Sequence, residues 1–478
     1  MGARSFLGVV HSGPRYRGRS TMAQVATIEG ERVESLAAGF SGVLLRSGDE
    51  GYEQVRRVHN ALVDKRPLLI ARCRGAADVV GALAFARSGG LEISVRGGGH
   101  NVGGKAVTDG GVMIDLSLMK GIHVDTAAQT ARAQGGVTWG ELNRETALHG
   151  LATTGGVVST TGIAGLTLGG GLGWLNGVHG LAVDNLLSVE LVTASGDVLT
   201  VTAKSDPDLF WALRGGGGNF GVATWFEYRL HPLQEVHGGL IAHPFDAASG
   251  VLRFFRDVSP KLPDELWVVA GLVHAPDGSG AKLAALAVCH CGPSAQAEQD
   301  LGPMLEFGSP VMSEVGPMPY PVVNTLFDEA YPPGVLNYWK SSFLHELRDE
   351  AINVLVERFA VTPSPMTAVV IEYFHGAVCR VDVSETAVPH REPGYNLGIF
   401  SEWTDPAATD ENVAWARETY AALEPHLAPL RYVNYLDEDD VGNAVRAAYG
   451  PNYERLRQLK RRYDPDNLFR LNTNIDPA

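Results

Sequence analysis

The sequence predicts an α+β protein with two domains, the second of which is built on an antiparallel sheet flanked by helices. Three observations support this prediction. The chain has 478 residues, which is more than the ~250–300 at which a single core stops growing. It has 57 glycines, more than is usual, and the excess is concentrated in three clusters within the first half. Beyond about Pro232 these clusters stop, and strand patterns alternate with helical patterns up to residue 430.

In the first half, local signals fix most of the expected elements. An apolar helical repeat over Ala76–Ser88 stops at Gly89-Gly90, which is typical of a helix C-terminus. A second helix is expected over Val137–His149, with Thr138 as its N-cap. Strands are expected at residues 91–95, 111–116 and 129–133, and a hairpin with a glycine turn over 187–202.

In the second half, alternating apolar residues predict four strands, with a helix at 346–360. These strands are Leu266–Val273, Leu283–His290, Ala368–Phe374 and Leu397–Trp403. A last basic segment, Tyr449–Phe469, is expected to be helical. We therefore expect a lead-in at residues 1–48, a first domain at 49–237 and a second domain at 238–430.

Composition excludes several classes of partner. Hydrophobic residues make up 45% and charged residues 19%, as in ordinary soluble globular proteins. The net charge of −15 argues against nucleic acid and against an anionic membrane surface. No apolar run reaches the ~20 residues of a membrane span. These features leave small molecules as the expected partners of a monomer or homodimer.

The four cysteines are too few for a disulfide scaffold. Cys289-His290-Cys291 suggests a metal site, but no second ligand pair follows at the spacing of structural zinc. We therefore expect no metal and interpret the cysteines as buried strand thiols.

The N-terminus predicts a cytoplasmic protein, with export as the open alternative. The apolar run Phe6–Val10 is shorter than the ~7–15 residues of a secretory signal. Residues 1–21 are therefore expected to be a disordered extension or to precede the true start at Met22.

The first glycine cluster, Arg96-Gly97-Gly98-Gly99-His100, follows an expected strand. Glycines at such a place allow backbone N–H groups to approach an anion closely. The dinucleotide fingerprint G-x-G-x-x-G must open a helix, whereas this loop continues through Gly103-Gly104 into another strand. A plain glycine-rich turn is the alternative.

Two further clusters strengthen the interpretation as a ligand site. Residues 155–174 hold eight glycines among small and apolar residues, and residues 208–222 contain Gly215-Gly216-Gly217-Gly218. A segment with so little side chain packs flat against a large planar ligand or tightly against itself.

Together the three clusters resemble the berberine-bridge-enzyme-like FAD-linked oxidases, a family of the vanillyl-alcohol-oxidase superfamily. The resemblance runs from about Gly51 to Ile475, and Gly180–Asn185 and Leu209–Ala212 are similar to the bacterial branch related to 6-hydroxy-D-nicotine oxidase. It implies a two-part PCMH-type FAD-binding domain at 49–237 and a substrate domain at 238–430. Residues 431–478 are then expected to return to the FAD-binding domain.

The resemblance implies one covalent bond to FAD. In the family, the histidine of this loop bonds the 8α carbon of the flavin, and that position is His100 here. Many members add a second bond from a cysteine in a G-x-C-x-x-V-G segment. Aligning Gly156 and Gly162 with its glycines puts Val158 at the cysteine position, so a mono-covalent FAD is expected.

The resemblance also implies the remaining FAD contacts. The pyrophosphate is expected against Val95 to Asn101, with Arg96 beside its charge. Val222 is expected near the adenine and Asn472 near the isoalloxazine, although plain packing is the alternative for both. The expected set is Val95, Arg96, Gly97, Gly98, Gly99, His100, Asn101, Gly156, Thr161, Gly162, Gly165, Gly169, Val222 and Asn472.

An oxidase of this type needs a base, because a proton must leave as hydride is transferred. Tyr432-Val433-Asn434-Tyr435 matches the family's Y-x-N-Y motif, whose second tyrosine is the base in several members. Tyr435 has that place here; a core tyrosine is the alternative. A tyrosine base requires that cations or the flavin favour its phenolate, since its free pKa is near 10.

Three further residues are candidates for the substrate site. In sugar-oxidising relatives the position of Glu372 carries an acid that assists the tyrosine, and strand alternation places Glu372 and Phe374 on one face. Asn396 stands where the alkaloid-cyclising members have glutamate, so we expect it to hydrogen-bond substrate. Lys340 is a weaker candidate, because a structural strand is the favoured interpretation of its segment Tyr338-Trp339-Lys340-Ser341.

The sequence thus predicts an oxidase that moves hydride from a C–H bond of a small alcohol, sugar or amine to FAD, with O2 as acceptor and hydrogen peroxide as product. A flavin-dependent dehydrogenase with another acceptor and a catalytically decayed flavin-binding protein are the alternatives. Glu372 favours a sugar, whereas the nicotine-oxidase-like first half favours an amine.

Overall fold

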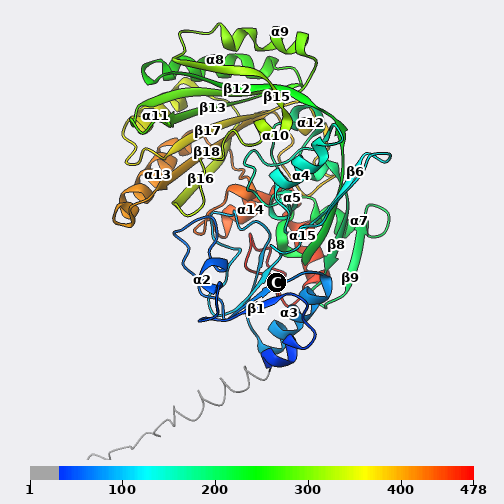
Figure 1. Cartoon of the computed structure of the whole chain (residues 1–478). Helices are drawn as coiled ribbons and strands as arrows, with labels where there is room; N and C mark the ends of the chain where they lie inside the picture. The colour runs from blue at the N-terminus through cyan, green and yellow to red at the C-terminus, as the bar shows by residue number, and fades with distance from the viewer. Residues whose placement is uncertain (1–31) are drawn as a thin grey trace, which may run out of the picture.

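The computed structural model describes residues 32–478, so the predicted extension at 1–21 lies outside the described residues. Figure 1 shows a large sheet with helices on its outer face and the remaining elements beneath its inner face. Strands from the first 232 residues make three smaller sheets, and strands from Glu235 to Trp403 make the large one. The predicted α+β class is therefore confirmed.

The first of the smaller sheets has four strands in the order β1 (Val43–Leu45), β2 (Leu69–Arg72), β4 (Val112–Asp115) and β3 (Ile93–Arg96). β2, β4 and β3 run parallel, and β1 is antiparallel to β2. The second sheet is antiparallel, with the order β5 (Ile122–Asp125), β6 (Thr130–Gln134), β10 (Val222–Arg229), β8 (Leu186–Val192) and β9 (Val198–Thr202). β7 (Leu151–Ala152) pairs with β11 (His231–Pro232).

The helices of this half follow their local signals. α3 (Ala76–Gly89) ends at Gly90, which has a left-handed φ of 62° and donates to two carbonyls of the last turn. α4 (Trp139–Ala147) begins at Thr138, whose side chain and Glu141 form a capping box. Both predicted helices and the β8–β9 hairpin are confirmed. The shorter helices are α2 (Tyr52–Val55), α5 (Ile163–Leu168), α6 (Asn176–His179) and α7 (Pro207–Leu213).

The large sheet has seven antiparallel strands. Their order is β15 (Met312–Pro319), β12 (Glu235–Pro244), β14 (Lys282–His290), β13 (Leu266–His274), β17 (Ala368–Phe374), β18 (Gly394–Trp403) and β16 (Leu336–Leu344). The four predicted strands are its centre and are confirmed. β12 and β15 were not predicted, because Gly238, Gly239, Pro317 and Pro319 interrupt their alternation.

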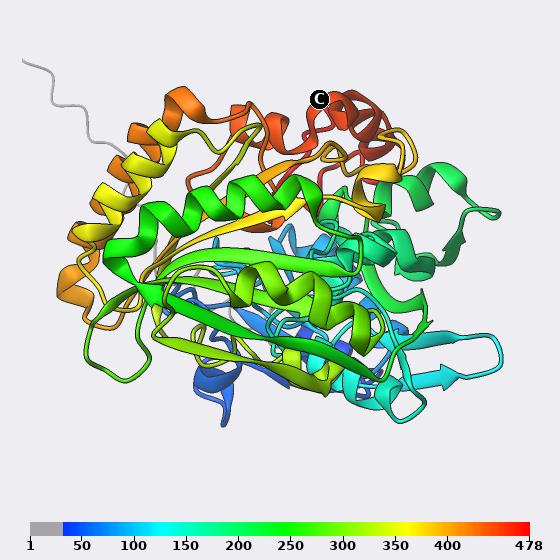
Figure 2. The ribbon, with the colours of Figure 1, turned by 90° about the horizontal axis from the view of Figure 1, so that it is seen from above.

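Four helices cover the outer face of this sheet, and Figure 2 shows them lying over its strands. They are α8 (Ala248–Val258), α9 (Ser294–Leu305), α11 (Asp349–Ala360) and α13 (Thr409–Leu423). Alternate residues of the strands, such as Val268, Ala270 and Leu272, pack against them in one apolar core. The other residues of each strand face inward, where α10 (Tyr320–Val323) and α12 (Ala377–Arg380) also lie.

The C-terminal segment contains a short turn at Val433–Tyr435, α14 (Asn443–Tyr449) and α15 (Tyr453–Tyr463). The predicted helix over Tyr449–Phe469 is wrong at both ends. It ends early because the buried Asp464 carboxylate accepts hydrogen bonds from the amides of Leu468 and Phe469, which turns the chain. Lys460 pairs with Asp464 at 2.7 Å and donates to the Asn219 carbonyl, which holds this segment on the third glycine cluster.

The cysteine interpretation is correct only in part. Cys289 is buried in β14, but Cys379 lies in α12, and both Cys379 and Cys291 are only half-buried. Between residues 32 and 478, no group of three metal-ligating side chains comes together. Over the same residues, none of the helices combines the length and the apolarity that crossing a bilayer requires.

Candidate functional site

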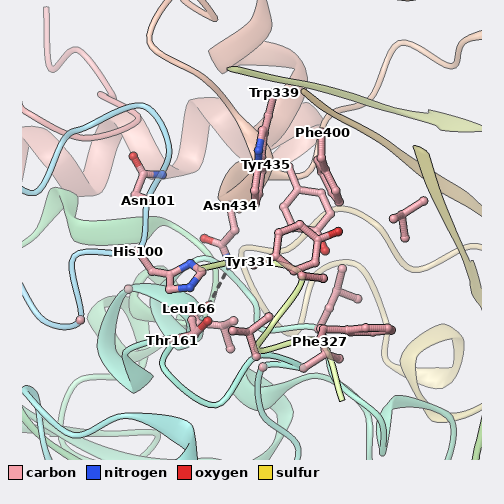
Figure 3. A pocket seen from close by; sticks show the side chains of 18 of the residues that line it. His100, Asn101, Thr161, Leu166, Phe327, Tyr331, Trp339, Phe400, Asn434 and Tyr435 are labelled. Carbon is pink, nitrogen blue, oxygen red and sulfur yellow. Dashed lines mark hydrogen bonds between the residues drawn. The ribbon is translucent and has the colours of Figure 1, made fainter. Parts of the chain in front are cut away.

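A cavity of about 880 Å³ lies between the inner face of the large sheet and the glycine clusters. Loop residues 97–101, residues 156–172 and residues 217–223 line one side, and strands β12 to β18 line the other. The segments 432–435 and 471–473 complete the wall. Figure 3 shows His100, Thr161 and Asn434 on one side of this space and Tyr331, Phe400 and Tyr435 on the other.

The glycine loop has the backbone that the sequence predicts. β3 ends at Arg96, and no helix intervenes before β4. A Cβ added to Gly98 would lie 2.7 Å from the Cα of Gly162, and a Cβ on Gly162 would lie 2.7 Å from the Cα of Gly98. The two backbones therefore cross at a distance that only glycine permits on both sides, and together they form one edge of the cavity.

Side chains of β3 alternate, which decides the role of Arg96. Ile93 and Val95 line the cavity, whereas the Arg96 guanidinium points away, donates to the Val55 carbonyl and lies 4.0 Å from the Asp115 carboxylate. The prediction that Arg96 lies beside a bound anion is therefore wrong for its side chain. Among the described lining residues, Lys105 is the one lysine or arginine. Burial lowers its pKa, while Asp440 and Asp437 raise it.

The second glycine cluster lines the cavity as expected, although part of it is the short helix α5. Val158, at the position of the family's second linking residue, also lines the cavity. The predicted residues that line the cavity are Val95, Gly97, Gly98, Gly99, His100, Asn101, Gly156, Thr161, Gly162, Gly165, Gly169 and Asn472.

Val222 and Asn472 differ in their placement. The Val222 side chain is buried in the core with Val192 and Phe469, and its neighbours Gly221 and Ala223 line the cavity instead. Asn472 lines the cavity beside Gly218. Its Nδ2 donates to the Phe469 carbonyl at 2.9 Å, and its buried Oδ1 has no partner among residues 32–478.

The structure brings the three predicted catalytic residues together. The Tyr435 hydroxyl donates to Oε2 of Glu372 at 3.4 Å, and Nδ2 of Asn396 donates to the same oxygen at 2.7 Å. Glu372 and Asn396 are cross-strand partners in β17 and β18. Tyr435 and Glu372 line the cavity, but Asn396 does not. The prediction that Asn396 contacts substrate is therefore wrong; it lies behind Glu372 and positions the carboxylate.

Burial dominates the electrostatics of this cluster. Burial raises the pKa of Glu372 to about 7, although the hydrogen bonds from Asn396 and Tyr435 act in the opposite direction. Burial and the neighbouring Glu372 charge raise the pKa of Tyr435 well above 10. At neutral pH, Tyr435 therefore keeps its proton, and Glu372 exchanges between its two forms.

Aromatic side chains surround Tyr435, and the sequence did not indicate them. Trp339 of β16 and Phe400 of β18 have ring centroids 4.2 Å apart, and Phe400 lies 5.4 Å from Tyr435. The next residue of β16, Lys340, points away and pairs with Asp439 at 2.5 Å and Asp440 at 3.1 Å. Lys340 is therefore not a residue of the pocket, because strand alternation gives that place to Trp339.

A second unexpected feature is a pair of stacked histidines. The ring of His59 lies 3.9 Å from the ring of His100, at an interplanar angle of 22°. The His59 amide donates to the Gly99 carbonyl at 2.9 Å. Burial lowers the pKa of His59 to about 4 and, together with the His59 charge, lowers the pKa of His100 to about 3. Both rings are therefore neutral, and the buried Nε2 of His100 has no hydrogen-bond partner in the described chain.

Comparisons with known proteins identify the family of the chain. The FAD binding domain family matches residues 67–202, and the berberine and berberine-like family matches residues 431–476. An FAD-linked oxidoreductase of Dictyostelium discoideum is 32% identical over 93% of this chain and 97% of its own length. The chain belongs to the berberine-bridge-enzyme-like FAD-linked oxidoreductases. It is therefore an enzyme with an FAD-binding domain.

Two further comparisons concern one type of relative. The (R)-6-hydroxynicotine oxidase of Paenarthrobacter nicotinovorans is 34% identical over 92% of this chain and 97% of the relative. The crystal structure of 6-hydroxy-D-nicotine oxidase from Arthrobacter nicotinovorans matches with a TM-score of 0.85 and 32% identity, over 92% of this chain and 98% of that one. The predicted resemblance to this branch of the family is confirmed.

The glycine crossing generates a first prediction. Gly162→Ala should force the two loops apart and lower the free energy of unfolding by about 1–3 kcal/mol, as overpacking does. The purified variant should also carry less flavin, which the ratio of absorbance at flavin and protein bands measures. Gly250→Ala in α8 is the matched control, because its Cβ meets nothing within 4 Å. Equal flavin content in both variants would contradict this role of the crossing.

Proposed function

We propose that this enzyme is an oxidase that removes hydride from a C–H bond next to a hydroxyl or amine of a small molecule. It holds FAD through one covalent bond to His100 and uses O2 as the electron acceptor. The observation that carries this proposal is the contact between the Tyr435 hydroxyl and the buried Glu372 carboxyl, at the wall of the cavity that the glycine loops extend.

The residues present fit FAD. The Gly98–Gly162 crossing leaves backbone exposed to the cavity without side chains, and Lys105 supplies a cation for a diphosphate. His100 is neutral, lines the cavity and has a free Nε2, so its imidazole is available as a nucleophile. Val158 cannot form a second bond, which leaves a single attachment. When bound there, FAD would supply a hydride acceptor that O2 reoxidises, with hydrogen peroxide as the product.

Tyr435 and Glu372 move the substrate proton as a pair. Tyr435 alone is a poor base, because its raised pKa disfavours the phenolate. When Glu372 is ionised, the Tyr435 hydroxyl proton passes to Oε2 while the phenolic oxygen takes the proton of the substrate hydroxyl or amine. No free phenolate forms, and the proton ends on the Glu372 carboxyl. The pKa of this carboxyl is about 7, so near neutral pH it can both accept the proton and release it again. Asn396 keeps Oε2 in place for this transfer.

The covalent bond is tested by acid precipitation. We expect a yellow pellet from the wild type and a colourless pellet from His100→Ala, because the proposed single bond is made by His100. We also expect His59→Ala to slow covalent incorporation, since the stacked ring holds His100 in position, and His59→Phe to restore it. A colourless wild-type pellet would show that FAD is held without a bond.

The chemistry is tested by a screen of sugars, alcohols and cyclic amines for peroxide release. With any substrate that the wild type oxidises, Tyr435→Phe should slow anaerobic flavin reduction by about 10²–10⁴-fold, the usual contribution of a positioned base. Tyr373→Phe is the matched control, because Tyr373 lies on the helix-covered face of β17. Unchanged reduction in Tyr435→Phe would overturn this assignment, and flavin reduction without peroxide would identify a dehydrogenase.

The pH profile tests the role of Glu372. The ionised carboxylate is the active form, so kcat/KM should fall as pH drops through about 7, the pKa of Glu372. The Asn396 hydrogen bond favours the ionised form. Asn396→Ala should therefore move this limb of the profile to higher pH, and Glu372→Gln should remove it. If the acidic limb of the kcat/KM profile stays at the same pH in Asn396→Ala, the proposed proton transfer from Tyr435 to Glu372 is contradicted.

A further inference from the structure

We propose that the inner face of the large sheet carries a slot for a flat, apolar ring system of the substrate. The slot is formed by Ala242, Ala285, Gly271 and Val370, which line the cavity beside Glu372. This inference rests on one part of the proposed function, namely that the C–H bond to be oxidised lies next to Tyr435 and Glu372. It names the class of molecule that the site accepts.

Strand register places the slot. Glu372 is paired with Val269, which is paired with Ala287, and Ala287 is paired with Leu240. The next inward-facing row, two residues along each strand, is the slot row of Val370, Gly271, Ala285 and Ala242. Two residues span about 7 Å along a strand, so the slot begins about one ring width from the Glu372 carboxyl.

Larger side chains flank Gly271 on its own strand, where Val269 and Val273 line the cavity on either side, whereas Ala287 of β14 and Ala368 of β17 leave the cavity wider. Leu240 and Val269 stand in the row of Glu372, and Leu283 and Val273 form the pair of the row beyond. Gly398 continues the slot row across β18, but the Phe400 ring lies over it and closes that end beside Trp339. The slot is therefore narrowest at Gly271 and bounded at one end by Phe400, which suits a flat ring system.

The backbone around Gly271 does not require a glycine at this position. A Cβ added there would meet only the Val273 side chain at 3.4 Å and the Val369 carbonyl at 3.6 Å, which are ordinary contacts. The fold therefore tolerates a side chain at this position, and the space above Gly271 belongs to the cavity. Phe327 and Tyr331, from a separate loop, line the same cavity and add aromatic surface to it (Figure 3).

The chemistry of the slot decides between the two substrate classes that the sequence left open. None of its four side chains has a hydrogen-bond donor or acceptor, and neither do Leu240, Val269, Leu283 and Val273. A saccharide would bury several hydroxyls here without partners, which is unfavourable for each of them. An aromatic or other unsaturated ring system would bury its apolar surface against these side chains without leaving a polar group unpaired. The geometry thus points to an aromatic alcohol or amine as substrate.

Binding to the flavin-loaded enzyme tests this class directly. The probes are benzamide and 2-naphthamide, which carry one ring and two fused rings and have no oxidisable C–H, against glucose and cellobiose. Perturbation of the flavin absorbance gives the Kd of each. We expect 2-naphthamide to bind about 10-fold tighter than benzamide, because its second ring is buried in the slot. The two saccharides should cause no perturbation at millimolar concentration.

A variant at Gly271 tests whether the slot causes the difference in Kd between the two amides. Gly271→Leu should remove the advantage of the second ring and leave the Kd of benzamide within about 3-fold of wild type, since filling the slot spares the space at Glu372. Gly250→Leu, on the exposed side of α8, is the control and should change neither value.

Several results would overturn the slot. These are tighter binding of a saccharide, equal binding of the two amides, no perturbation by either amide, or equal weakening of both by Gly271→Leu. The measurement is one of binding, so a missing covalent bond or missing peroxide would count against the proposed function alone. Conversely, if the enzyme forms peroxide from a substrate but does not bind the two amides, the result counts against the slot alone.

Discussion

The close crossing of Gly98 and Gly162 is the constraint on which the rest of the site depends. A Cβ on either residue would fall within 2.7 Å of the Cα of the other, so the two loops meet only because both lack side chains. The crossing brings the loop after β3 against the start of α5, and it sets the position of His100, which follows one residue after Gly99. His59 then stacks on His100 through its bond to the Gly99 carbonyl. One backbone contact thus fixes the glycine cradle and the position of His100 together.

The large sheet fixes the positions of the residues on the opposite wall of the cavity. Strand alternation gives one face to the core under α8, α9, α11 and α13 and the other face to the cavity. Glu372 and the slot row are consecutive inward rows of the same strands, so their separation is set by backbone hydrogen bonds and not by mobile loops. Tyr435 reaches this face from the C-terminal segment, which Lys460 and Asp464 hold on the third glycine cluster.

Local signals in the sequence correctly predicted the structural features that depend on only a few neighbouring residues. The end of α3 at Gly90, the Thr138 cap and the loop without a helix after Arg96 are of this kind. The errors concern side-chain direction or distant partners. Arg96, Asn396 and Lys340 were placed in the site, but register and alternation point each of them away from it. His59 and Trp339 were missed because only the fold brings them to His100 and Tyr435.

Desolvation links the catalytic pair to the choice of substrate. The pKa of Glu372 reaches about 7 because apolar walls surround the carboxyl, and the same walls are the inner face of the sheet. A site that admitted a hydrated polyol would have to supply polar partners, and these partners would stabilise the carboxylate and lower its pKa. An acid at position 372 is therefore compatible with a sugar or with an aromatic substrate, and its surroundings decide between them. Under the proposed mechanism the apolar rows favour the aromatic molecule, because its burial preserves the environment that raises the pKa of Glu372.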